Sequence, residues 1–410
     1  MSILDKEIPQ RWHKVWERIR PYRKEEVKKA IEELQSDPAF NAILQKFPQE
    51  VKTLLQAKSC KVESVDQFRQ ELVAPLVHLL LDKSTFSYDL SGTSSLRRFD
   101  AATLLSNHRD ILLDAAILNL CLLEVGMPLV RMAVGDNLLY MPWVTILMRL
   151  SDAVLVERNL PPKAFVESSK GFSAFLEWSV QEEKKSIWIA QREGRAKDNN
   201  DKTQPSLLKM LTLQGGDGSL ESRLLNMNIV PMTISYEYDP CDYLKAKEVL
   251  ERTKKGSYTK APGEDVCSMK QGLLGEKGRV HIHLGTPLVD LIAAAKDKGI
   301  LAEEATRRPN DYLADIASII DHEIHSRYRL YPGNYIAEDN LSHTAPLYRG
   351  HYSDDDVKAF SDYIEERLAL ASPSSVEEAN ELRKLLLLQY ATPLRNYYKT
   401  RRKSKKTREV

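Results

Sequence analysis

The fold assignment starts from residues 101–114, which read Ala101-Ala102-Thr103-Leu104-Leu105-Ser106-Asn107-His108-Arg109-Asp110-Ile111-Leu112-Leu113-Asp114. The apolar run at the start predicts a buried strand, and the apolar stretch that follows predicts a helix. Polar residues fill the junction between the two. Ligands bind at the carboxyl ends of strands in open α/β sheets, so this junction is the first candidate for a functional site.

The alternation of a strand with a helix is repeated along the middle of the chain. Besides Ala101–Leu105, the predicted strands are Leu129–Val134, Ala153–Val156, Ser186–Ala190, Ile229–Ser235 and Arg279–Leu284. The predicted helices between them are 110–124, 138–150, 162–182, 205–213 and 242–252. This order predicts an α/β fold with a largely parallel central sheet flanked by helices.

The flanking regions are predicted to be helical. We expect an N-terminal helical domain over 1–85, where glycine is absent, and the α/β domain over 86–300. A helical C-terminal extension is expected over 301–393. The residues from 394 to 410 are rich in lysine and arginine and are predicted to form a basic disordered tail.

Composition excludes several classes of protein. The 410 residues are 42% hydrophobic and carry a net charge of +1, which is ordinary for a globular protein and gives no overall field for nucleic acid. The four cysteines are scattered without zinc-ligand spacing, so we expect no metal, no disulfide framework and a reducing cytosol. The N-terminus does not resemble a signal peptide, and charges interrupt the most apolar stretch, so no transmembrane span is predicted.

The junction after Leu105 could hold a general base. His108 is followed by Asp110 and Asp114, which lie four residues apart and hence on one face of a helix. A carboxylate can orient a histidine and stabilise the imidazolium that forms when a hydroxyl proton is removed. The alternative is that Asp110 caps the helix and His108 is an ordinary loop residue.

Polar residues also follow two other predicted strands. Glu193, Gly194, Arg195 and Lys197 follow Ser186–Ala190. Arginine can bind phosphate with its planar fork and glycine allows close backbone approach, although an isolated Glu-Gly-Arg is more often a solvated turn. Arg158 follows Ala153–Val156. Its position at a third strand end predicts that these groups share one edge of the sheet.

Taken in order, these blocks resemble the glycerolipid acyltransferase superfamily, which includes glycerol-3-phosphate and 1-acylglycerol-3-phosphate acyltransferases. The positions that match are Asn107-His108, Arg158, Glu193-Gly194-Arg195 and Val230-Pro231. The resemblance covers about 100–290. Ile234–Glu237 and Gly278–Pro287 are similar to the glycerol-3-phosphate branch in particular.

Two features depart from the family pattern. The family spacing would place the acid at Leu113, whereas here the acids are Asp110 and Asp114. One residue turns a helix by about 100°, so Asp114 can replace the usual acid only if the preceding loop absorbs the extra residue. We favour Asp114 as the partner of His108. The third block is one residue shorter than usual, so Arg195 and Lys197 would share phosphate binding.

The resemblance implies an O-acyltransferase of phospholipid synthesis. His108 would remove the proton of the acceptor hydroxyl, while Arg158, Glu193, Gly194, Arg195 and Lys197 would bind the acceptor phosphate. The donor would be acyl-CoA or acyl-carrier protein, and the acceptor glycerol 3-phosphate or 1-acylglycerol 3-phosphate. No cofactor, metal or covalent acyl-enzyme is implied.

A lipid product suggests a peripheral position at the inner face of the cytoplasmic membrane. The basic tail could contact an anionic membrane surface, and the Trp12 and Trp16 face could lie in the interface. Alternatively, the tail contacts nothing and the tryptophans pack against the helical domain.

Two other functions remain open. One is an acyltransferase with a non-phosphate acceptor such as an acyl-amino-acid lipid. The other is a non-catalytic RNA-binding protein that uses the basic tail, although no RNA-binding motif is visible and we do not expect nucleic acid as a partner.

Overall fold

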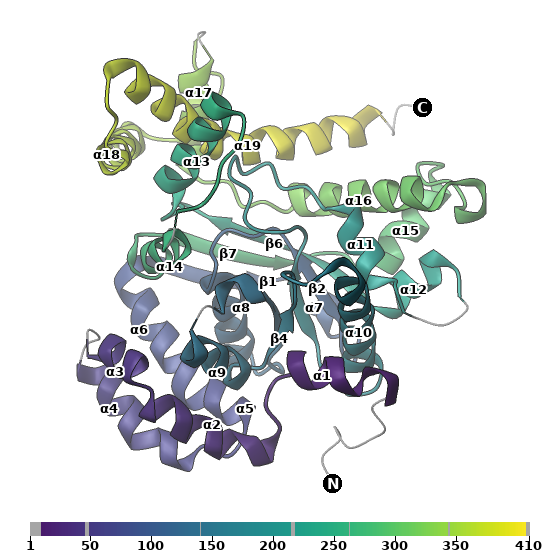
Figure 1. Ribbon diagram of the computed structural model, residues 1–410. Coiled ribbons are helices and arrows are strands. Elements are labelled where there is room, and N and C mark those ends of the chain that lie inside the picture. Colours follow the sequence, from purple (N-terminus) through teal and green to yellow (C-terminus); the bar gives the residue numbers. More distant parts are fainter. Residues whose placement is uncertain are drawn as a thin grey trace.

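The computed structural model describes residues 10–45, 49–139, 141–214, 218–261, 263–342 and 345–406. At its centre lies a seven-stranded sheet with the order β1-β7-β6-β2-β5-β3-β4 (Figure 1). The strands are β1 (Thr85–Ser91), β2 (Thr103–Ser106), β3 (Arg131–Gly135), β4 (Ala153–Val156), β5 (Ile187–Ala190), β6 (Ile229–Tyr236) and β7 (Gly278–Leu284). The β6–β7 pair is antiparallel and the other five neighbouring pairs are parallel. The predicted largely parallel sheet is confirmed.

The strand directions bring many loops to one edge of the sheet. The carboxyl ends of β2 to β6 meet there, together with the amino ends of β7 and β1. The sequence reading missed β1, because this edge strand exposes side chains such as Phe86 and lacks the apolar run of an internal strand.

Helices cover both faces of the sheet, and helices from the N-terminal and C-terminal parts of the chain lie outside them (Figure 1). Their bounds, in chain order, are α1 (His13–Ile19), α2 (Lys24–Ser36), α3 (Pro38–Leu44), α4 (Gln49–Lys58), α5 (Val65–Phe68), α6 (Ala74–Ser84), α7 (Thr93–Leu96), α8 (Leu113–Glu124), α9 (Pro142–Leu150), α10 (Pro162–Gln181), α11 (Pro205–Leu211), α12 (Leu220–Asn226), α13 (Asp242–Lys255), α14 (Glu264–Leu274), α15 (Leu288–Asp297), α16 (Pro309–Ser326), α17 (Pro332–Leu341), α18 (Asp354–Ala371) and α19 (Val376–Lys406).

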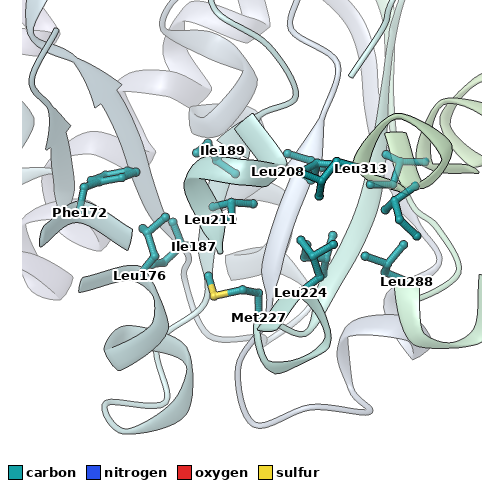
Figure 2. Packing of buried hydrophobic residues seen from close by; sticks show 14 of the residues in the cluster. Phe172, Leu176, Ile187, Ile189, Leu208, Leu211, Leu224, Met227, Leu288 and Leu313 are labelled. Atoms are coloured by element: carbon teal, nitrogen blue, oxygen red, sulfur yellow. The ribbon is translucent and has the colours of Figure 1, made fainter. Parts of the chain in front are cut away.

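Two apolar cores sandwich the sheet. On one face, side chains of α1, α10, α11, α15 and α16 pack on the strands, and Figure 2 shows part of this cluster around Ile187 and Leu211. On the other face, α6 and α8 pack on the strands through residues such as Leu81 and Leu118. Helix α8 is apolar nearly all round, which explains why it is buried.

The N-terminal helices divide between two cores. Helices α2 and α5 join α9 in a separate cluster, but α1 packs on α10. Trp16 is 2% exposed and donates a hydrogen bond from Nε1 to the Gly171 carbonyl at 2.9 Å. The tryptophan face therefore packs inside the protein, against the α/β layer rather than against the N-terminal helices, and the predicted boundary at residue 85 does not separate α1 from the sheet.

The C-terminal residues differ from the prediction of disorder after 393. Helix α19 continues through Leu394 to Lys406, and the residues beyond lie outside the described part of the chain. Leu394 is fully buried and Tyr397 packs on the main core. The basic composition obscured these apolar residues at helical spacing, and their burial holds the helix in place.

A buried ion network joins the N-terminal helices to the sheet. The carboxylate of Asp152 accepts from Arg69 Nη1 at 3.1 Å and from Arg131 Nε at 3.0 Å, and all three side chains are at most 3% exposed. Asp152 has φ +62°, a conformation that aspartate and asparagine tolerate. Burial alone would raise the pKa of Asp152, but the charges of Arg131, Lys185 and Arg69 lower it to about 2.

We expect Asp152→Asn to lower the free energy of unfolding at pH 7 by about 3–5 kcal/mol, because it leaves buried arginines without their carboxylate. The low folded-state pKa stabilises the protein above the unfolded value of 3.8, and this stabilisation is lost as pH falls from about 4 to about 2. Urea unfolding of wild type and Asp152→Asn at several pH values would measure this loss of stability. The control is Asp66→Asn, since Asp66 pairs with the same Arg69 but is half-exposed. An unchanged acid sensitivity in Asp152→Asn would contradict this account.

Candidate active site

Asn107 fixes the start of the candidate site. Its side-chain Nδ2 donates to the Ile234 carbonyl at 2.9 Å, and its Oδ1 accepts from the Ile234 N–H at 2.8 Å. These two bonds continue the β2–β6 pairing one step beyond Ser106, where the backbone of β2 leaves the sheet. Asn107 is fully buried, so the backbone that carries His108 leaves the sheet in a fixed direction.

His108 is oriented by Asp114. The Nδ1 of His108 donates to Asp114 Oδ2 at 2.7 Å, and the ring packs edge-on against Trp188 with a centroid distance of 5.6 Å. The same Oδ2 accepts the N–H of Arg109 at 2.7 Å and that of Asp110 at 3.2 Å. The Nε2 of His108 makes no hydrogen bond to any residue in the described ranges, which leaves it available to a substrate.

The loop before α8 absorbs the extra residue in this block. Helix α8 begins at Leu113, so Asp114 lies in its first turn and points back to His108. Asp110 instead caps this helix: its Oδ1 accepts from the N–H groups of Leu112 and Leu113 at 2.9 and 2.8 Å. Burial, followed by the neighbouring Asp114, raises the pKa of Asp110. The geometry thus supports Asp114 as the partner of His108 and assigns Asp110 a capping contact.

The Arg158 and Glu193 side chains meet at the same edge of the sheet. Arg158 Nη1 donates to Glu193 Oε1 at 3.0 Å, and the Arg158 N–H donates to Asp136 Oδ2 at 3.1 Å. Gly194 has φ +65° and is exposed, so a left-handed turn rather than close packing explains the glycine. No contact among the described residues joins this pair directly to His108.

Arg195 and Lys197 turn inward from this loop. Arg195 is 6% exposed, and its buried Nη1 has no hydrogen-bond partner within the described chain. Burial would lower its pKa, but Cys241, Asp110 and Asp239 raise the pKa of Arg195 above the usual value. Lys197 pairs with Glu248 at 2.5 Å.

Sequence reasoning missed several polar residues around the histidine. Arg109 is 4% exposed and forms a buried ion pair with Asp201. Lys245, from α13, donates to the Arg109 carbonyl at 3.1 Å and to the carboxylate of Asp239. Tyr236 ends β6, and burial and then Asp114 raise its pKa well above the usual value. Neither Asp201 nor Lys245 is distinguishable in the sequence from the many charged residues of solvated turns and helices.

Comparison with known proteins identifies the class. Residues 88–235 match the family model Acyltransferase, a segment that runs from β1 to β6 and contains His108, Arg158 and Arg195. Over this segment the chain is similar to acyltransferases, as its motifs predicted, and the match supports an enzyme of acyl transfer. This match favours an enzyme over the non-catalytic RNA-binding protein considered above.

Other comparisons add little. No curated protein matches the chain. Among solved structures, the chain is similar to the 1-acyl-sn-glycerophosphate (LPA) acyltransferase PlsC from Thermotoga maritima, with 12% identity and a TM-score of 0.31, over 62% of this chain and 80% of that one.

Asp114→Asn should lower kcat for acyl transfer by about 10²–10⁴-fold, because an amide cannot stabilise the imidazolium and favours the wrong tautomer of His108. Steady-state kinetics with a thiol-detecting reagent would measure the loss. Asp110→Asn is the matched control, since its side-chain oxygen can still accept from Leu112 and Leu113. A larger kinetic loss in Asp110→Asn than in Asp114→Asn would contradict the roles inferred from the geometry.

Proposed function

We propose that the protein moves a fatty acyl group from acyl-CoA or acyl-carrier protein to a hydroxyl of glycerol 3-phosphate or 1-acylglycerol 3-phosphate in phospholipid synthesis. The observation that carries the proposal is the His108–Asp114 hydrogen bond of 2.7 Å at the carboxyl end of β2. No cofactor is required, since the thioester itself activates the acyl group.

The proposed reaction uses His108 as the general base. Its Nε2 removes the proton from the acceptor hydroxyl as the oxygen attacks the thioester carbonyl, and Asp114 stabilises the resulting imidazolium. The tetrahedral intermediate then collapses, the carbon–sulfur bond breaks, and the leaving thiolate takes the proton from His108. The products are an ester and a free thiol.

Arg195 is the strongest candidate for the acceptor phosphate. A buried guanidinium with an unpartnered Nη1 can donate a charge-assisted hydrogen bond to a phosphate without first breaking an ion pair. Arg158 and Lys197 are already paired with Glu193 and Glu248, so each would have to leave its carboxylate to bind a phosphate.

The same pairing keeps a second acceptor in consideration. Because Arg158 and Lys197 are compensated by carboxylates of this chain, a site for an acceptor without phosphate, such as an acyl-amino-acid lipid, would carry no uncompensated charge at these two positions. Arg195 distinguishes the candidates, since only a phosphate acceptor should depend on its positive charge.

We expect purified protein to consume long-chain acyl thioesters only when an acceptor hydroxyl is supplied. The assay would combine acyl-CoA or acyl-carrier protein with glycerol 3-phosphate, 1-acylglycerol 3-phosphate or an acyl-amino-acid lipid. His108→Ala should abolish turnover, and Arg195→Gln should raise KM for a phosphate acceptor by about 10–100-fold, the loss of one charged hydrogen bond. Turnover with the phosphate-free acceptor alone would replace the glycerol-phosphate assignment, and silence with every pair would contradict the proposal.

We also propose peripheral contact with the inner face of the cytoplasmic membrane through the end of α19. Lys399, Arg401 and Arg402 are exposed there, whereas Arg395 is paired with Glu338. None of the described helices is long and apolar enough to cross a membrane. The exposed charges of Lys399, Arg401 and Arg402 can supply electrostatic attraction to anionic lipid.

Replacing Lys399, Arg401 and Arg402 together with glutamine should weaken binding to vesicles of phosphatidylglycerol and phosphatidylcholine by about 100-fold, at about 1 kcal/mol for each charge. Co-sedimentation at low and high salt would measure it, with neutral vesicles as the control. Equal binding of the variant to the anionic vesicles would contradict this role of α19.

A further inference from the structure

One buried carboxylate holds the residues on both sides of His108. Asp201 is 1% exposed, and its Oδ2 accepts from Asn107 Nδ2 at 3.1 Å. The guanidinium of Arg109 donates two hydrogen bonds to the Asp201 carboxylate, from Nη2 to Oδ2 at 2.6 Å and from Nη1 to Oδ1 at 3.1 Å. Since Asn107 and Arg109 flank His108 in the chain, one side chain restrains the backbone before and after the histidine.

The carboxylate is itself anchored by the C-terminal helices. The hydroxyl of Tyr328, just after α16, donates to Asp201 Oδ2 at 2.6 Å. His325 Nε2, in α16, donates to the Asp201 carbonyl at 2.6 Å. Asp201 therefore connects α16 to the His108 loop by hydrogen bonds.

A second contact runs in parallel through Asn199. Its Oδ1 accepts from Arg109 Nη1 at 2.8 Å, and its Nδ2 donates to the Gln389 carbonyl of α19 at 3.0 Å. The Arg109 side chain thus contacts Asn199 and Asp201, the two end residues of the short segment 199–201. This segment follows Arg195 and Lys197, the candidates for phosphate binding, in the chain. The His108 loop, this segment and α19 form one hydrogen-bonded unit.

We propose that Asp201 is the positioning residue for His108 in acyl transfer. The inference rests on the proposed role of His108 as general base. It assigns Asp201 no contact with substrate: its carboxylate keeps Arg109 in place, and with it the Arg109 N–H that donates to Asp114. The same Asp114 oxygen orients His108, so a shift of Arg109 displaces the histidine and its partner together.

Loss of the carboxylate charge should release Arg109. The Arg109 side chain borders a small cavity that is also lined by Tyr328, Asn334 and Gln389. A buried guanidinium without its carboxylate is strongly disfavoured, and this cavity gives it space to move. Misplacement of a catalytic group by about 1 Å can cost about 100-fold in rate.

The test compares Asp201→Asn with Asp242→Asn. Asp242 is an equally buried carboxylate that pairs with Arg367 at 2.7 Å and accepts from Tyr390 at 2.7 Å, but its side chain makes no direct hydrogen bond to the His108 loop among the described residues. Both variants should lower the melting temperature. Only Asp201→Asn should lower kcat, by about 10–100-fold, with KM for donor and acceptor within about threefold of wild type.

The double variant Asp201→Asn with Arg109→Met provides a second kinetic readout. Removing the uncompensated guanidinium should recover part of the kcat lost in Asp201→Asn, as a coupled pair requires. Equal kcat losses in Asp201→Asn and Asp242→Asn, or an unchanged kcat in Asp201→Asn, would overturn the proposal.

Hydrogen exchange separates this inference from the proposed function. The Arg109 and Asp110 amides donate to Asp114, so mass-spectrometric exchange of a peptide covering 103–114 reports the loop geometry without any substrate. Faster exchange in Asp201→Asn but not in Asp242→Asn supports positioning, even if wild-type protein is inactive with every acceptor. If the wild-type enzyme turns over and exchange in Asp201→Asn is unchanged, the positioning role of Asp201 is overturned.

Discussion

The geometry of the candidate site depends on the pairing of the Asn107 side chain with the backbone of Ile234. At the end of β2, the polypeptide must leave the sheet, and the amide of Asn107 replaces the missing backbone partner of β6 with one donor and one acceptor. The groups of Ile234 are thus satisfied in a fully buried position, where unpaired groups would be costly. The following residue, His108, can lie in a short loop without freedom to reorient.

Charged groups in this protein are buried in compensated clusters. Around His108, two carboxylates make different contacts: Asp114 contacts the histidine, and Asp110 caps the helix. Farther away, Asp152 links two arginines between the sheet and the N-terminal helices, and Asp242 pairs with Arg367 beneath the C-terminal helices. The Asp152 and Asp242 clusters join segments distant in sequence, so they hold the outer helical layers on the sheet.

The sequence was sufficient for strands β2 to β7 because each contains a short, buried apolar run. Six of the strands were located from those runs, and the polar junction at Asn107-His108 was found from its place after the first of them. Strand β1 was missed because its residues, Thr85–Ser91, are mostly polar and lack an apolar run, unlike those of the other edge strand, β4. The choice between Asp110 and Asp114 depends on where α8 begins, and the start at Leu113 is decided by the loop geometry rather than by helical periodicity.

Contacts between distant segments were beyond the reach of sequence reasoning. Asp201 and Lys245 are ordinary charged residues until the fold brings them to Arg109. The C-terminal residues were judged by their charge, whereas Leu394 and Tyr397 pack on the protein and hold α19 in place. For the same reason, the buried Trp16 could not be distinguished from a membrane-facing residue.

The contact between Asn199 and Gln389 has a consequence for the growing chain. Translation produces the His108 loop more than 200 residues before the helices α16 and α19 that support it. While the C-terminal segment is still inside the ribosome, the nascent chain carries the sequence motifs of the enzyme without the contacts from α16 and α19. The order of synthesis therefore delays completion of the His108 loop until α16 and α19 can fold over the sheet.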